Sequence, residues 1–365
     1  MINRLPTASI ISALVLMLFT SFSAQTLPLN EEDAVHVKAF NLPESALLDG
    51  NARVAVKSAA ERQSDQIDAE SKTCPPIATA DRDQLPSIRK CQANAFYRSS
   101  WYKLLRDRYD VVISSQEIGG IQTEVFTPAD SIAPKNKNRV LLNLHGGAFI
   151  VGARTFSHLE SIPIASSGKI KVISIDYRQA PEYSFPAASE DVAAVYRQLL
   201  KTYEPKNIGI YGCSAGGLLT AQVVAWLQNE KLPQPGAVGM FCGAADYWMK
   251  GDSGYLGTAI IGVPVQTSRD NPYLKNAEIN DPLAFPLRSS LVMAKFPPAL
   301  LIASSRDYAL SSVVQTHSVL IRQGVEAELH VWEGVSHAFI FHSELSQSQE
   351  AFSVMIKFFD THLGM

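Results

Sequence analysis

Short apolar runs alternate with segments of helical spacing from residue 140 to the end of the chain. Runs rich in β-branched and aliphatic residues predict buried strands, and apolar positions three and four residues apart predict helices. The predicted strands cover 140–144, 207–211, 299–303 and 327–331, and the predicted helices cover 218–230, 312–324 and 350–362. The loops that follow these strands are therefore the first places to search for chemistry.

Two regions lack this strand-and-helix pattern. Residues from about 25 to 108 have no β-rich character; they are mixed polar and helical, with breaks at Pro75, Pro76 and Pro86. Residues 247–295 lie between predicted strands and contain many Gly, Pro, Asn and Asp residues. Both regions are expected to lie outside the core that the strands form.

The stretch Gly212-Cys213-Ser214-Ala215-Gly216-Gly217 directly follows the predicted strand at 207–211. A strand that runs into G-x-S-x-G and then into a helix is typical of a nucleophile elbow, a sharp turn that exposes a serine hydroxyl. The glycines are needed because such a turn is strained and leaves no room for a Cβ. The helix N-terminus would also favour negative charge as it develops. Ser214 is therefore the predicted nucleophile.

A second glycine pair follows the predicted strand at 140–144, in His145-Gly146-Gly147-Ala148-Phe149. Consecutive glycines free the backbone to point N–H groups at a developing oxyanion, and the amide of Ala215 would supply another donor. His145 itself is expected to be structural, holding the loop by hydrogen bonds.

A serine nucleophile needs a base and a carboxylate that orients the base. His337 has the best context of the eight histidines, because it follows the predicted strand at 327–331 and precedes the C-terminal helix. Asp307 follows the predicted strand at 299–303, so serine, aspartate and histidine occur in the order expected of an α/β-hydrolase. Glu333 is a possible substitute for Asp307, although its closeness to His337 along the chain favours a loop role.

These residues resemble the hormone-sensitive-lipase-like family of α/β-hydrolase esterases, which includes bacterial carboxylesterases. The resemblance extends from about residue 140 to the C-terminus. It rests on the two glycine motifs, Asp307 and His337, and on further matches at 176–182, 185–191 and 296–300. It implies the α/β-hydrolase fold, with a mostly parallel central sheet, helices on both faces and a mainly helical cap. It also implies an oxyanion hole formed by backbone amides of Gly146, Gly147, Ala148 and Ala215.

The chain departs from the family pattern at two positions. Ala148 stands where the family usually has a third glycine, and its N–H is expected to serve provided that its φ is negative. Cys213 stands where the family usually has an aspartate before the nucleophile. As a small thiol it is expected to be a buried core residue that points away from the site.

The resemblance also implies a domain organisation. Residues 25–108 would form an N-terminal cap or extension, and residues 109–365 would form the catalytic domain with a cap insertion at about 247–295. A lid of this kind would exclude water and shape the acyl or alcohol pocket. A loosely packed N-terminal extension is the alternative for residues 25–108.

These features together predict a serine hydrolase that cleaves carboxylic esters through an acyl-enzyme. The expected substrate is a small-molecule ester with a short or medium acyl chain. Alternatives are an amidase or peptidase of related fold, a non-catalytic small-molecule receptor, and a detoxifying hydrolase for a specific lactone or drug ester. The receptor is disfavoured because such family members typically lose the catalytic histidine, which this chain retains.

Composition supports an ordinary globular protein of 365 residues, with 46% hydrophobic and 18% charged residues and a formal net charge of −3. No block of like charge is present, so nucleic-acid binding is not expected. The sequence contains neither a glycine-rich phosphate loop nor a close group of metal ligands, so no cofactor and no metal are expected. The sequence makes no prediction of oligomeric state.

The N-terminus predicts a signal peptide at residues 1–24, with Arg4, an apolar stretch at 8–19 and small residues before the cleavage site. The apolar stretch is short for a membrane span, so export to the periplasm or medium is favoured over an uncleaved anchor. An exported protein can form disulfides. Of three possible pairings, Cys74 with Cys91 is favoured because both lie outside the predicted core, which leaves Cys213 and Cys242 free and buried.

Overall fold

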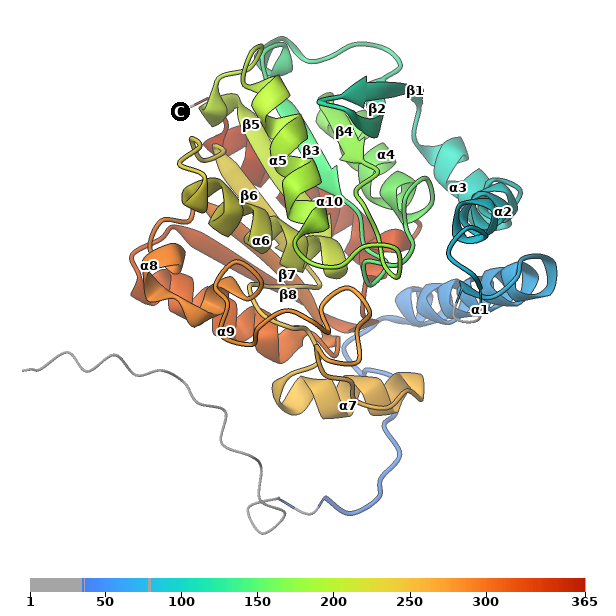
Figure 1. Ribbon diagram of the computed structural model, residues 1–365. Helices are drawn as coiled ribbons and strands as arrows, with labels where there is room; N and C mark the ends of the chain where they lie inside the picture. Colours follow the sequence, from blue (N-terminus) through green and yellow to red (C-terminus); the bar gives the residue numbers. More distant parts are fainter. Residues whose placement is uncertain (1–34, 36, 78–79, 365) are drawn as a thin grey trace, which may run out of the picture. The chain divides into compact units, whose positions relative to one another are not determined.

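The computed structural model describes residue 35 and residues 37–77 and 80–364 (Figure 1). Residues Asn41–Met365 form one compact unit. The predicted signal peptide, residues 1–24, lies outside the described residues. Within the described residues, no helix combines the length and the apolar character needed to cross a membrane.

Eight strands among the described residues form one sheet in the order β1-β2-β4-β3-β5-β6-β7-β8. The antiparallel pairs are β1 with β2 and β2 with β4, and the remaining neighbours are parallel. The mostly parallel sheet predicted from the sequence is therefore confirmed. The strands are β1 Val111–Ile118, β2 Ile121–Pro128, β3 Val140–Leu144, β4 Lys171–Ile175, β5 Ile208–Cys213, β6 Ala237–Phe241, β7 Ala299–Arg306 and β8 Ala327–Ser336.

Helices cover both faces of the sheet, as predicted (Figure 1). Buried side chains of α5 (Ala187–Leu199), α6 (Ala215–Asn229) and α9 (Leu310–Arg322) pack in one apolar cluster. Those of α4 (Phe156–Gly168) and α10 (Ser346–His362) pack in the other. Because both faces are covered, the central strands β3, β5 and β6 are buried along their whole length. Their continuous apolar runs in the sequence follow from this burial.

Three helices precede the sheet: α1 (Gly50–Thr73), α2 (Leu85–Tyr97) and α3 (Ser100–Arg108). Buried residues of α2 and α3 join the cluster that contains α4 and α10. A disulfide between Cys74 and Cys91 ties the end of α1 to α2, which confirms the predicted pairing. Cys213 and Cys242 are free and buried, also as predicted.

The segment predicted as a cap insertion, 247–295, contains α7 (Gly251–Ile261), α8 (Ser290–Met293) and many turns. Short 3-10 turns complete the described structure at η3 Pro134–Asn136, η4 Pro205–Asn207, η5 Pro286–Arg288 and η6 Phe339–Phe341.

Each of the predicted site segments directly follows a strand. His145 follows β3, Ser214 follows β5, Asp307 follows β7 and His337 follows β8. These four strands are parallel, so their carboxyl ends meet at one edge of the sheet. Topology alone therefore gathers the segments at one edge, although they are far apart in sequence.

Candidate active site

Ser214 lies in a sharp turn between β5 and α6, with φ 57° and ψ −119°. This left-handed backbone is strained for a residue with a Cβ. A Cβ at Gly216 would lie 1.7 Å from the Leu144 carbonyl oxygen, and one at Gly212 would lie 2.1 Å from the same atom. Only glycine fits at these two positions, because the end of β3 presses directly on the turn. The predicted elbow geometry is present.

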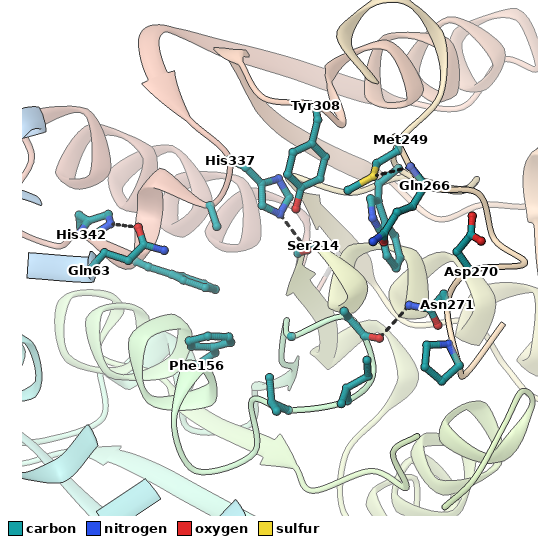
Figure 2. A pocket seen from close by; sticks show the side chains of 18 residues that line it. Gln63, Phe156, Ser214, Met249, Gln266, Asp270, Asn271, Tyr308, His337 and His342 are labelled. Atoms are coloured by element: carbon teal, nitrogen blue, oxygen red, sulfur yellow. Dashed lines mark hydrogen bonds between the residues drawn. The ribbon is translucent and has the colours of Figure 1, made fainter. Parts of the chain in front are cut away.

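The Ser214 hydroxyl is the first member of a hydrogen-bonded chain of three side chains. Its Oγ lies 2.8 Å from Nε2 of His337 (Figure 2), and Nδ1 of the same ring lies 2.7 Å from Oδ1 of Asp307. Because a carboxylate accepts hydrogen bonds, Nδ1 carries the proton and Nε2 is left to accept from the serine. The structure thus brings together the three residues predicted from the sequence, in the geometry that base-assisted nucleophilic attack requires.

Asp307 is held rigidly behind the histidine. Its side chain is fully buried, and Oδ1 also accepts a hydrogen bond from the Ala309 amide at 2.7 Å. Tyr308 stacks on the His337 ring with 4.1 Å between centroids. Burial raises the pKa of Tyr308 well above its usual value, so its phenol stays protonated beside the histidine. Glu333, the alternative to Asp307, is not in this chain, because its carboxylate accepts from the Ser45 hydroxyl at 2.7 Å.

The loop after β3 provides backbone donors, with one correction to the prediction. The Gly146 amide donates to the Glu160 carboxylate at 2.8 Å, so it is not available to an oxyanion. Among the hydrogen bonds of the described residues, the amides of Gly147 and Ala148 donate none. The amide of Ala215, the first residue of α6, has no acceptor within its helix. Three of the four predicted donors are therefore unoccupied.

A second correction concerns the backbone of Ala148. Its φ is 55°, so the expected negative value is wrong; the N–H nevertheless donates no hydrogen bond among those of the described residues, and it is this free N–H, not the sign of φ, that keeps it available to an oxyanion. Gly147 and Phe149 also have positive φ, at 111° and 64°. The carbonyl of Gly147 accepts from the amides of Ile150 and Val151, so the loop closes into a tight turn. Ala148 takes the left-handed conformation because this turn imposes it, at a cost that the glycine usual in the family avoids.

His145 has the structural role predicted for it. Its ring is fully buried, stacks on Tyr177 with 4.2 Å between centroids, and donates from Nδ1 to the Gly146 carbonyl at 2.8 Å. Burial lowers the pKa of His145 to about 4, so the ring is neutral at physiological pH. The Tyr177 hydroxyl donates to the His145 carbonyl at 2.7 Å and further fixes the start of the loop.

A pocket of about 530 Å³ opens above Ser214 and His337. Figure 2 shows Gln63, His342 and Phe156 on one side of the serine, and Met249, Gln266, Asp270 and Asn271 on the other. Gln63 belongs to α1, and the residues on the second side belong to the 247–295 segment. Both regions predicted as caps therefore contribute side chains to the pocket.

Tyr308, Gln63 and Phe156 line the pocket but were not predicted from the sequence. Tyr308 directly follows Asp307, so its position beside the histidine could have been anticipated. Gln63 and Phe156 carry no such indication, because no motif surrounds them and only the packing of α1 and α4 brings them to the pocket.

One group of potential metal ligands comes together in the part of the chain that the structure describes. Donor atoms of Cys242, Asp307 and His337 all lie within 4.8 Å of one another. Asp307 and His337 already form a hydrogen bond at 2.7 Å, so this group overlaps the serine chain. The hydrogen bond between Asp307 and His337 explains why these two side chains lie close together, so their arrangement does not require a metal.

Comparison with known proteins identifies the family. A family model described as the α/β-hydrolase fold matches residues 141–341. The chain belongs to the α/β-hydrolase fold family. The matched region of this α/β-hydrolase contains Ser214, Asp307, His337 and the loop after β3, so the family and fold predicted from the motifs are confirmed.

Individual relatives agree with this assignment. An acetyl-hydrolase of Streptomyces hygroscopicus is 26% identical over 253 residues, which cover 67% of this chain and 84% of that protein. The crystal structure of an esterase named E25 is 27% identical with a TM-score of 0.75, and the match covers 91% of this chain and 100% of that one. An esterase from the bacterial hormone-sensitive lipase family is 24% identical with a TM-score of 0.69, covering 87% and 99%. The prediction that the chain is a carboxylesterase-type hydrolase is thus confirmed.

Proposed function

We propose that this α/β-hydrolase cleaves carboxylic esters through an acyl-enzyme formed on Ser214. The observation that carries the proposal is the unbroken chain from the Ser214 Oγ through His337 to Asp307, with separations of 2.8 and 2.7 Å. An imidazole that donates through Nδ1 to Asp307 presents Nε2 to the serine hydroxyl and can take its proton.

In the proposed reaction His337 removes the proton of Ser214 as the hydroxyl attacks the ester carbonyl. Asp307 holds the imidazole tautomer and stabilises the imidazolium that forms. The amides of Gly147, Ala148 and Ala215 receive the oxyanion, with Gly146 omitted because its N–H is occupied. His337 then protonates the leaving alcohol, and water attacks the acyl-enzyme by the reverse route.

The proposed substrate is a small-molecule ester with a short or medium acyl chain. A pocket of about 530 Å³ suits a small ligand. The similarity to an acetyl-hydrolase supports a small acyl group. Trp248 and Phe156 offer apolar surface, while Gln63 and Gln266 offer polar groups, so both halves of an ester find suitable contacts.

We also propose that α1 and the 247–295 segment act as a cap. Gln63 from the first and Trp248 from the second both line the pocket, which supports this role. Export through the predicted signal peptide is part of the same proposal. The Cys74–Cys91 disulfide supports it, because disulfides persist mainly in oxidising compartments.

A panel of p-nitrophenyl esters of increasing acyl length tests the proposal, with aminoacyl anilides as the competing amide substrates. The expected result is highest kcat/KM on acetyl to hexanoyl esters and little turnover of anilides. The matched control is Ser214→Ala, which should lose ester turnover while keeping the circular dichroism spectrum of the wild type. Equal activity in that variant, or a preference for anilides, would refute the proposal.

A further inference from the structure

Glu160 is a buried carboxylate that the proposed mechanism does not use. It lies in α4, is 2% exposed, and forms no ion pair with any described residue. A carboxylate buried without a basic partner is costly unless N–H donors surround it. The burial of this carboxylate next to the candidate site therefore needs a physical explanation.

The donors around Glu160 come from the two segments that must be aligned for catalysis. Its Oε1 accepts from the amide of Gly146 at 2.8 Å, in the loop after β3. Its Oε2 accepts from the amide of Cys213 at 3.2 Å, the residue before the nucleophile. One carboxylate thus joins the loop after β3 to the elbow. Both contacts are made by backbone amides, so they depend on the Glu160 side chain and not on the side chains of Gly146 or Cys213.

A third donor orients the carboxylate itself. The Asn143 side-chain amide donates to Oε2 at 2.8 Å, and the Asn143 carbonyl oxygen accepts from the Ser174 hydroxyl at 2.7 Å. The network therefore extends from β4 through β3 to α4. Burial raises the pKa of Glu160 to about 8, while the three N–H donors oppose that shift by favouring the charged form. Both carboxyl oxygens accept from N–H groups and neither donates in any hydrogen bond of the described residues, so this geometry is that of a carboxylate.

The contact between the two segments is close enough for small displacements to matter. A Cβ at Gly146 would lie 2.9 Å from the Cys213 carbonyl oxygen and 3.4 Å from Oε1 of Glu160. Gly147 and Ala148, two of the proposed oxyanion donors, follow Gly146 directly. A shift of Gly146 away from the elbow would carry these two amides away from the point where the oxyanion forms.

We propose that Glu160 is a positioning residue, which sets the distance between the oxyanion donors and Ser214 by accepting hydrogen bonds from both of their segments. This inference rests on the proposed esterase function. Because an oxyanion exists only in the transition state and intermediate, loss of the alignment should lower kcat and leave KM nearly unchanged.

The experiment compares Glu160→Gln with the wild type on p-nitrophenyl acetate. Glutamine has the same shape, but its NH₂ group must face N–H donors at one end, so at least one of the three contacts is lost. The expected result is a fall in kcat of about 10- to 100-fold with KM within about threefold. The Ki of a trifluoromethyl ketone, which forms a tetrahedral adduct on a serine, should rise in parallel with the loss in kcat.

The matched control is Glu124→Gln, since Glu124 is also buried but pairs with His158. It should keep wild-type kcat and Ki even if its melting temperature falls. If Glu160→Gln does not fold, Glu160→Asp replaces it, because the shorter side chain keeps the charge but cannot span both segments. The same fall in kcat is expected for it.

Three results would overturn the inference: a folded Glu160 variant with kcat within twofold of the wild type, an equal loss in Glu124→Gln, or a change confined to KM. Inactivity of the wild type itself would instead refute the proposed function. The two failures are therefore distinguishable.

Discussion

Arg89 in α2 and Glu182 in the loop after β4 form a two-point ion pair, with Nη1 on Oε1 and Nη2 on Oε2. The same guanidinium donates to the carbonyls of Ile150 at 3.0 Å and Ala180 at 2.8 Å. Ile150 in turn donates its amide to the Gly147 carbonyl at 2.9 Å. An N-terminal helix is thereby connected to the loop that carries the proposed oxyanion donors.

Replacing Arg89 with lysine should weaken both the fold and the reaction. Lysine offers a single ammonium in place of a planar fork, so it cannot satisfy the two carbonyls and the carboxylate together. We expect the free energy of unfolding to fall by about 2 kcal/mol in urea titrations, and kcat to fall several-fold. Arg82→Lys is the control, because Arg82 makes an exposed hydrogen bond with the Glu182 carbonyl and lies over the Tyr183 ring, without contacting Ile150 or Ala180 in any described hydrogen bond. Equal effects of the two substitutions would contradict this account of Arg89.

The double variant Cys74→Ser/Cys91→Ser should be less stable than the wild type. The disulfide closes a loop with a sequence separation of 17, for which chain entropy predicts a loss of about 3 kcal/mol. Urea unfolding with and without reductant measures it. Reductant should destabilise the wild type and leave the double variant unchanged. The prediction fails if the oxidised wild type and the double variant unfold at the same urea concentration.

His342 should make stability depend on pH in a known direction. Burial lowers its pKa to about 4, with Glu344 opposing the shift and Arg62 adding to it. The unfolded chain binds this proton at higher pH than the folded one, so stability falls as pH drops from about 6.5 to 4.

His342→Gln should remove the part of the pH dependence of stability that comes from His342. Urea titrations at several pH values should show the stability difference between variant and wild type changing by up to about 3 kcal/mol over this range. His330→Gln, at a more exposed position on β8, is the control and should leave the slope of the wild type intact. An identical pH dependence in wild type and His342→Gln would show that His342 is not buried as a neutral group.

Local sequence predicts most of the candidate site because the required features are local. The elbow needs Gly212 and Gly216 beside Ser214, and the chain order of Ser214, Asp307 and His337 follows from the strand order. A mostly parallel sheet is predictable for the same reason, since fully buried strands leave continuous apolar runs.

The parts that sequence could not predict depend on contacts between distant segments. Gly146 was expected to face an oxyanion, but Glu160 lies fourteen residues later and reaches its amide only because α4 folds back under the loop. The positive φ of Ala148 follows from the tight turn around the Gly147 carbonyl. Gln63 lines the pocket because α1 packs beside it, and no motif marks that position.

The most direct measurement of the central claim is labelling of the folded wild type with a fluorophosphonate, followed by peptide mass spectrometry. The account predicts one adduct per chain, on Ser214, and none in Ser214→Ala or after the probe is added to unfolded protein. A well-folded wild type that stays unlabelled, or that carries its adduct on another residue, would contradict it.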